Sequence, residues 1–166
     1  MGVVSPQSRH APNRIGPAGA ERISAGAYGL LVAASTLIGL GRSSAGTIII
    51  VVMITNLVYF ATHVFAYSIG DTEIGWTHVR HHLRVSAPMI SAAFVPLLTV
   101  LALLALGFDT GIATLIGMIT ATVLLALVAV GGLRLRGIRG WPLLLMAAGT
   151  LLLAAVLILA EFFVPH

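Results

Sequence analysis

Five apolar runs, separated by short polar segments, make up most of the chain. Each run is close to the ~20 residues that an α-helix needs to cross a ~30 Å hydrocarbon core. The runs cover residues 23–40, 47–69, 88–106, 110–132 and 141–164. This pattern predicts an all-α membrane protein, built as a bundle of five transmembrane helices over residues 23–166.

The segment before the first run, residues 1–22, is polar, basic and rich in proline and glycine. Such a composition buries too little apolar surface to fold by itself, so we expect a disordered basic cytoplasmic tail. The first run is the shortest, and a cleaved signal peptide is the alternative interpretation. The polar segment is longer than the charged region that precedes the apolar core of a signal peptide, which favours a retained span.

Composition supports a bilayer environment. The chain has 166 residues, of which 58% are hydrophobic and only 8% are charged. A soluble chain is roughly a quarter charged. The sequence contains no cysteine, which excludes disulfides and thiolate metal sites. In a soluble protein the net charge of +4 would suggest nucleic acid as a partner. In a membrane protein this positive charge is better explained by the excess of arginine on the cytoplasmic side of the membrane, so no nucleic-acid partner is expected.

The nine basic residues are all arginines, and their positions alternate with the predicted spans. Only Arg42 follows the first run, on what would be the external side. The remaining eight fall on the opposite side: Arg9, Arg14, Arg22, Arg80, Arg84, Arg134, Arg136 and Arg139. Because cytoplasmic loops carry an excess of positive charge, we expect a cytoplasmic N-terminus and an external C-terminus in the plasma membrane.

The second run contains the strongly polar residues that lie deepest in any run. At 100° per residue, Asn56, Tyr59, His63 and Tyr67 fall within about 80° of one another and share one helix face. Exposing that face to lipid is costly, so it should point into the bundle or toward a partner chain. It either forms interhelical hydrogen bonds or lines a path for a proton, an ion or a small polar solute. The absence of Asp or Glu deep in any run argues against an ion-driven transporter.

Between the second and third runs, residues 71–85 are amphipathic and predict a short interfacial helix on the cytoplasmic side. Asp71 is a candidate N-cap, because its side chain can accept a hydrogen bond from the first turn. Trp76, Arg80 and Arg84 are expected to contact lipid headgroups.

Three histidines, His78, His81 and His82, share one face of this predicted helix. Their H-x-x-H-H spacing is one that membrane desaturases and hydroxylases use to hold iron. His78 and His82, one helical turn apart, could form a mononuclear metal site with Asp71. The diiron enzymes need more histidines than the six in this chain. His63 lies eight residues before Asp71, so in a continuous helix it would lie about 12 Å deeper in the membrane than Asp71. We therefore expect no metal and no cofactor, and the sequence favours a non-enzymatic role over an enzymatic one without deciding between them.

One part of the chain resembles a known family. The run from "ATHVFAYSIGD" through "GWTHVRHHLRVSAPMISAAFVPLLTVLALLALG" is similar to an uncharacterised family of small actinobacterial integral membrane proteins. The residues that carry the resemblance are His63, the Gly75–Trp76 pair, the arginine-bearing linker, and Pro88 and Pro96 in the following run. The resemblance implies a multi-spanning membrane protein and brings no established activity.

The sequence as a whole favours a small integral membrane protein that serves as a structural or accessory component of a membrane assembly. Its expected partners are the lipid bilayer and either a second copy or another membrane protein. A channel or transporter lined by the polar face of the second run is one alternative. A metal-dependent membrane enzyme using His78, His81 and His82 is the other.

Overall fold

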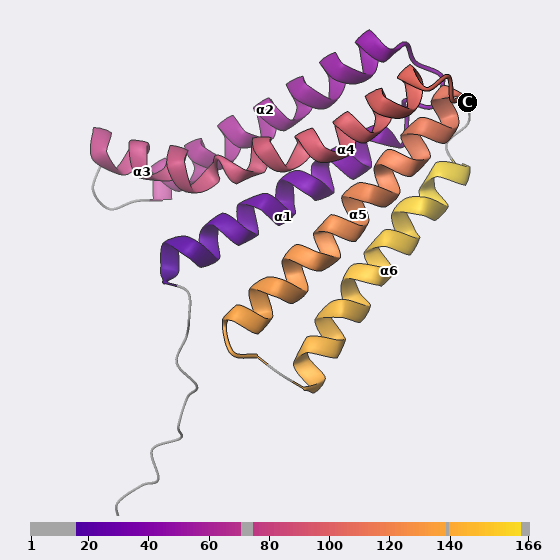
Figure 1. Cartoon of the computed structure of the whole chain (residues 1–166). Coiled ribbons are helices and arrows are strands. Elements are labelled where there is room, and N and C mark those ends of the chain that lie inside the picture. The colour runs from indigo at the N-terminus through magenta and orange to yellow at the C-terminus, as the bar shows by residue number, and fades with distance from the viewer. Residues whose placement is uncertain (1–15, 71–74, 139, 164–166) are drawn as a thin grey trace, which may run out of the picture.

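A computed structural model describes residues 16–70, 75–138 and 140–163, and within these ranges it contains six helices and no strand. The helices pack as an elongated bundle (Figure 1). Their bounds are α1 Pro17–Leu37, α2 Ala45–Gly70, α3 Trp76–Ser86, α4 Pro88–Ala105, α5 Thr110–Leu135 and α6 Trp141–Phe163.

Five of these helices lie where the apolar runs predict them, and four of the five begin and end within about three residues of the expected positions. The exception is α1, which begins at Pro17 rather than near residue 23. Proline is favoured at the first position of a helix, because its missing N–H would have no partner there. The last six residues of the predicted tail are therefore helical, which corrects the tail boundary. Residues 1–15 lie outside the described part of the chain.

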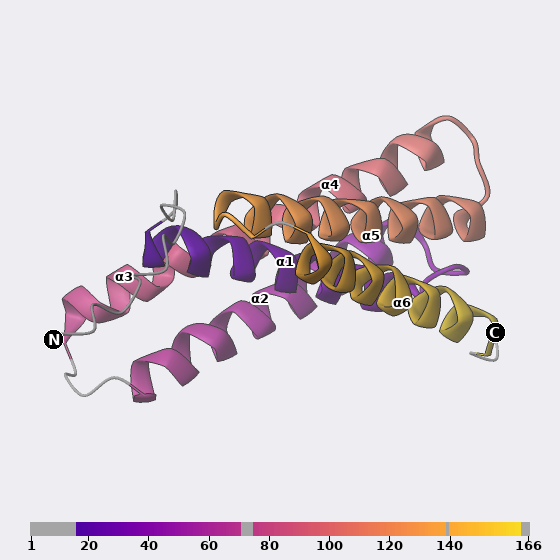
Figure 2. The same ribbon diagram turned by 90° about the horizontal axis from the view of Figure 1, so that it is seen from below.

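The short helix between the second and third runs is present as α3, but its arrangement differs from the expected one. It begins at Trp76, with Gly75 as its N-cap residue, and Asp71 lies outside the described residues. Ala87, between α3 and α4, has right-handed helical backbone angles, with φ −51° and ψ −35°. As a result α3 continues the line of α4 instead of lying across it (Figures 1 and 2). The combined helix, Trp76–Ala105, is 30 residues long, or about 45 Å.

Helix α1 is the centre of the bundle. It packs on α5, α4 and α2, whereas α6 packs chiefly on α5 at the edge (Figure 1). The small residues of α1 allow this close packing, since Ala25, Gly29 and Ala33 are all buried. A Cβ atom at Gly29 would overlap the backbone carbonyl of Met89 on α4. Gly117 on α5 is similarly enclosed, by side chains of α1 and α4. These approaches explain why small residues recur on the helix faces that meet.

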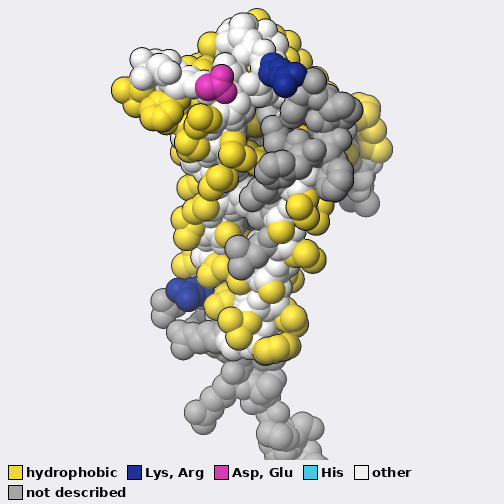
Figure 3. All heavy atoms as spheres, turned by 90° about the vertical axis from the view of Figure 1, so that its right-hand side faces the viewer, with side chains coloured by type: hydrophobic (Ala, Val, Ile, Leu, Met, Phe, Trp, Pro, Cys, Tyr) yellow, Lys and Arg dark blue, Asp and Glu magenta, His cyan; other side chains and the backbone are white. Residues whose placement is uncertain are grey.

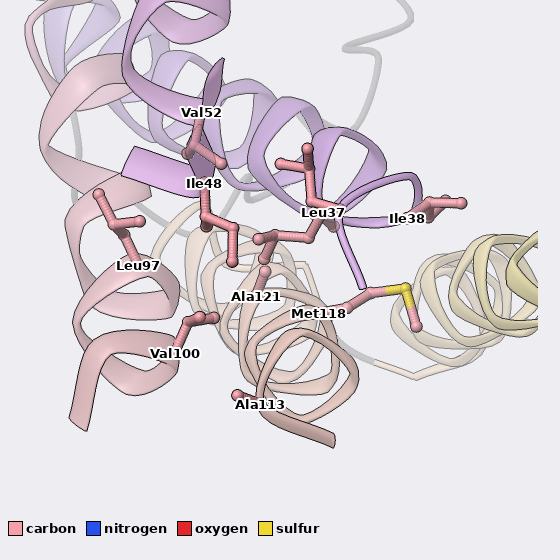
Figure 4. Close-up of a cluster of buried hydrophobic side chains, with 11 residues drawn as sticks. Leu37, Ile38, Ile48, Val52, Leu97, Val100, Ala113, Met118 and Ala121 are labelled. Atoms are coloured by element: carbon pink, nitrogen blue, oxygen red, sulfur yellow. The ribbon is translucent and has the colours of Figure 1, made fainter. Parts of the chain in front are cut away.

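The main hydrophobic cluster fills one half of the bundle, where α1, α2, α4 and α5 converge (Figure 4). Its largest fully buried members include Leu37, Ile48, Val52, Val100 and Met118. A second, smaller cluster lies further along α1, around Ala25, Val32 and Met89. The list of buried polar side chains in the described residues is short: Asn56, Ser86, Thr114 and Thr122.

Three helices are long and apolar enough to cross a membrane: Ala45–Gly70, Trp76–Ala105 and Thr110–Leu135. Most of their surface faces outward, as expected of helices surrounded by lipid. On the face in Figure 3, hydrophobic side chains cover the middle of the bundle, and the charged side chains of the described residues lie near its two ends. These features are typical of a membrane protein.

Candidate functional site

His63 and Tyr67 lie on the same face of α2, one helical turn apart, and their ring centroids are 4.7 Å apart. Tyr59 lies one turn before His63 on the same face. The helical period predicted this grouping, because residues three and four apart in an α-helix project on one side. The half of α2 that carries these rings lies beside α3 and the first half of α1 (Figures 1 and 2).

The histidines of α3 join this face. In an unbroken helix His63 would lie about 12 Å deeper than Asp71, and a break in the helix was the condition for His63 to approach these histidines. Helix α2 ends at Gly70 and α3 begins at Trp76. Helix α3 then returns beside α2. The ring of His82 is consequently 5.5 Å from that of Tyr67, and the ring of His81 is 5.8 Å from that of His82.

The third tyrosine of the chain, Tyr28 on α1, completes the arrangement. Its ring lies 5.9 Å from Tyr59 and 6.2 Å from His63, stacked on the latter at an interplanar angle of 28°. All three tyrosines and three of the six histidines thus form one continuous ring series. In spatial order the ring series is Tyr59, Tyr28, His63, Tyr67, His82 and His81. Tyr28 was not among the candidates predicted from the sequence, although a tyrosine in the middle of a helix rich in alanine and glycine was a usable signal.

A polar cavity of about 190 Å³ lies beside the ring series, between α1, α2 and the α3–α4 junction. It is lined by His63, Tyr67 and His82, together with Glu21 and Ser24 from α1 and Val85 and Ser86 from α3. Glu21 was not among the candidates predicted from the sequence, because residues 1–22 were predicted to form a disordered tail. Since α1 begins at Pro17, Glu21 lies in its second turn and faces the same cavity as two imidazoles.

Asn56 lies one turn beyond Tyr59 and is separate from the ring series. Its side chain is fully buried, and its amide nitrogen donates a hydrogen bond to the Val52 carbonyl of its own helix at 2.9 Å. Its side-chain oxygen is buried and accepts no hydrogen bond from the described residues. The interhelical hydrogen bond that one interpretation of this face required from Asn56 is therefore not formed within the described part of the chain.

Beyond Asn56 the polar face gives way to the main hydrophobic cluster. Val52 and Ile48, the next buried residues of α2, pack against Leu97 and Val100 of α4 without exposed surface at either position of α2 (Figure 4). None of the members of this cluster lines the cavity, so the cavity and the main hydrophobic cluster occupy different parts of the bundle.

The hydroxyl groups of the three tyrosines have no protein partner among the described residues. Tyr28, Tyr59 and Tyr67 are 42%, 43% and 49% exposed, while His63 between them is half-buried. The described residues provide no hydrogen bond to any of these hydroxyls. We call these three residues the tyrosine face of α1 and α2.

The remaining candidate residues lie on α3. Trp76, Arg80 and Arg84 are exposed, as headgroup contacts require. His78 and His82 lie one turn apart, whereas Asp71, their proposed co-ligand, is outside the described residues. Within the described ranges, no three His, Asp or Glu side chains are close enough to share a metal ion.

Comparison with protein-family models, curated proteins and solved structures finds no match for this chain. The resemblance to small actinobacterial membrane proteins therefore stays a prediction, and function has to be argued from the geometry.

Proposed function

We propose that the chain is a five-span integral membrane protein of the plasma membrane that acts as an accessory component of a membrane assembly. In this topology the N-terminus is cytoplasmic, the C-terminus is external, and α1 and α6 cross the bilayer beside the three helices identified above as long and apolar enough to do so. The alternation of the arginines supports this orientation. The tyrosine face is the surface through which the protein binds its partner.

The observation that carries this proposal is the exposure of tyrosine side chains near the middle of two helices, which would place them at mid-membrane depth in the proposed topology. Tyr28 and Tyr59 lie near the centres of α1 and α2, and their hydroxyls have no partner among the described residues. A hydroxyl in hydrocarbon without a hydrogen bond costs free energy, because lipid tails offer no acceptor. A partner transmembrane helix removes this cost by presenting hydroxyl or carbonyl acceptors, each bond contributing about 0.6–2 kcal/mol.

Site-specific photocrosslinking tests this interface. A photoreactive phenylalanine analogue placed at Tyr59 in intact membranes should give a discrete protein adduct. The matched control is the same analogue at Leu98, which lies at similar depth on α4 and is 60% exposed. We expect no adduct from Leu98. An adduct of twice the chain mass would identify a second copy as the partner, and an adduct of another mass would identify a different protein. Lipid adducts alone from both positions would contradict the proposal.

The polar cavity favours a second candidate function, the binding of a proton or a small cation that enters from the cytoplasmic side. Glu21, His63 and His82 provide the groups for it. Transport across the membrane would further require the packed cluster around Ile48 and Val52 to open.

Reconstitution separates the two candidates. For an accessory component, proteoliposomes should be no more permeable to protons or cations than empty vesicles. Flux through the wild type that is lost in His63→Leu, and retained in the neighbouring exposed variant Thr62→Leu, would instead establish the transport function.

A further inference from the structure

A groove lies on the flank of α1 that faces α6. Both α1 and α6 pack on α5 (Figure 1). Residues of all three helices line a cavity of about 210 Å³. Small side chains, including Ala27 and Ala129, form its floor, and Ile23, Leu133 and Met146 form its apolar walls. From residue 20 to residue 27 of α1, the groove extends along the helix for about 10 Å.

One end of the groove carries a positive charge. Arg136, the residue that follows the last turn of α5, lines the groove and is exposed. No carboxylate of the described residues forms an ion pair with it. The C-terminal end of α5 bears a partial negative charge of its own, so attraction for an anion comes from the guanidinium rather than from the helix backbone.

The combination of an apolar groove and a guanidinium at its mouth selects an amphiphile with an anionic head. The groove is smaller than the ~300–1,000 Å³ pockets that hold drug-sized ligands. Its volume is also too small to hold a transmembrane helix, which is about 10–12 Å across. A single acyl chain is slender enough to fit. Arg136 belongs to the arginine-rich side of the chain, and anionic phospholipids are enriched in the cytoplasmic leaflet that this side faces.

We propose that this groove binds one acyl chain of an anionic phospholipid, with the headgroup phosphate on Arg136. The site rests on the membrane orientation given above, but not on the partner surface, which is formed by Tyr28 on a neighbouring face of α1 and by α2. A guanidinium matches a phosphate with two parallel hydrogen bonds, and among the arginines of the described residues it is Arg136 that lines this groove.

Native mass spectrometry of the purified protein in detergent micelles tests the proposal, with phosphatidylglycerol and phosphatidylcholine added at equal concentrations. The decisive variant is Arg136→Gln, and its matched control is Arg80→Gln, which removes the same charge from α3, outside the groove. A third variant, Ala129→Phe, fills the groove and keeps all charges.

We expect wild type to bind phosphatidylglycerol in preference to phosphatidylcholine. Arg136→Gln should weaken phosphatidylglycerol binding at least about tenfold, because the phosphate loses its bidentate donor. Arg80→Gln should weaken it by no more than about fivefold, the effect of one arginine near a charged surface. Ala129→Phe should reduce the binding of phosphatidylglycerol although no charge is lost.

Two results would overturn the inference. Equal losses of phosphatidylglycerol binding in Arg136→Gln and Arg80→Gln would show that the lipid responds only to the general surface charge. Equal binding of the two lipids by wild type would show that the groove does not select an anionic head. Neither result depends on whether the tyrosine face has a protein partner, so this site and the proposed function can fail separately.

Discussion

The close approach of α1 and α4 at Gly29 makes a sharp prediction about stability. A Cβ atom at this position would lie 2.7 Å from the Met89 carbonyl carbon and 2.8 Å from its Cα, and closer still to the carbonyl oxygen. Carbon atoms pack best at about 3.5–4.0 Å, so Gly29→Ala has to move the two helices apart by roughly 1 Å. The obstacle is backbone, which cannot rotate away as a side chain can.

The expected magnitude follows from two opposing effects. Overpacking a close-packed core costs typically about 1–3 kcal/mol, and a backbone obstacle places Gly29→Ala at the upper end of that range. Replacing glycine by alanine within a helix stabilises the helix by about 1 kcal/mol. The net loss should therefore be about 2 kcal/mol. Gly149→Ala on α6 provides the control, since nothing lies within 4 Å of its added methyl group. It should show only the propensity gain of about 1 kcal/mol.

Reversible unfolding with SDS in mixed micelles measures these free energies directly. A third variant, Gly117→Ala, should fall between the other two, because its methyl group meets the Val100 and Leu37 side chains as well as the Pro96 carbonyl oxygen. The expected order of stability is Gly149→Ala, wild type, Gly117→Ala and Gly29→Ala. If Gly29→Ala were as stable as Gly149→Ala, the contact between α1 and α4 at this position would be wrong.

Three further predictions concern other parts of the molecule. Asn56→Leu should raise the free energy of unfolding by about 1 kcal/mol or more in the same titration, because it removes a buried oxygen without a hydrogen-bond partner and keeps a similar branched shape. A loss of stability would mean that the Asn56 amide makes a stabilising hydrogen bond. A topology reporter inserted after Leu135 should be active only in the cytoplasm and one fused after His166 only outside, and cytoplasmic activity of the latter would rule out five spans. Elemental analysis of the purified protein should find far less than one iron or zinc ion per chain; a content of about one that is lost in His78→Ala/His82→Ala would support the metal-enzyme alternative.

Local sequence determined the helices and one face of the site. Each apolar run fixes a helix by its length, and proline and glycine mark several boundaries, as Pro17 does for α1 and Gly70 for α2. The helical period placed Tyr59, His63 and Tyr67 together, since their relation depends only on the geometry of one helix. The period also grouped Asn56 with them, but the crossing of the helices buries Asn56 and leaves the tyrosines half-exposed.

The completion of the site depends on contacts between segments far apart in the sequence. Tyr28 meets Tyr59 and His63 because α1 crosses α2 at that level, and no pattern within either helix specifies the crossing. His82 reaches Tyr67 because α3 packs beside α2, and no pattern within either helix specifies the angle between them. Tertiary structure also decided that Arg136 borders a groove, because that groove exists only where α1 and α6 pack on α5 and not closely on each other.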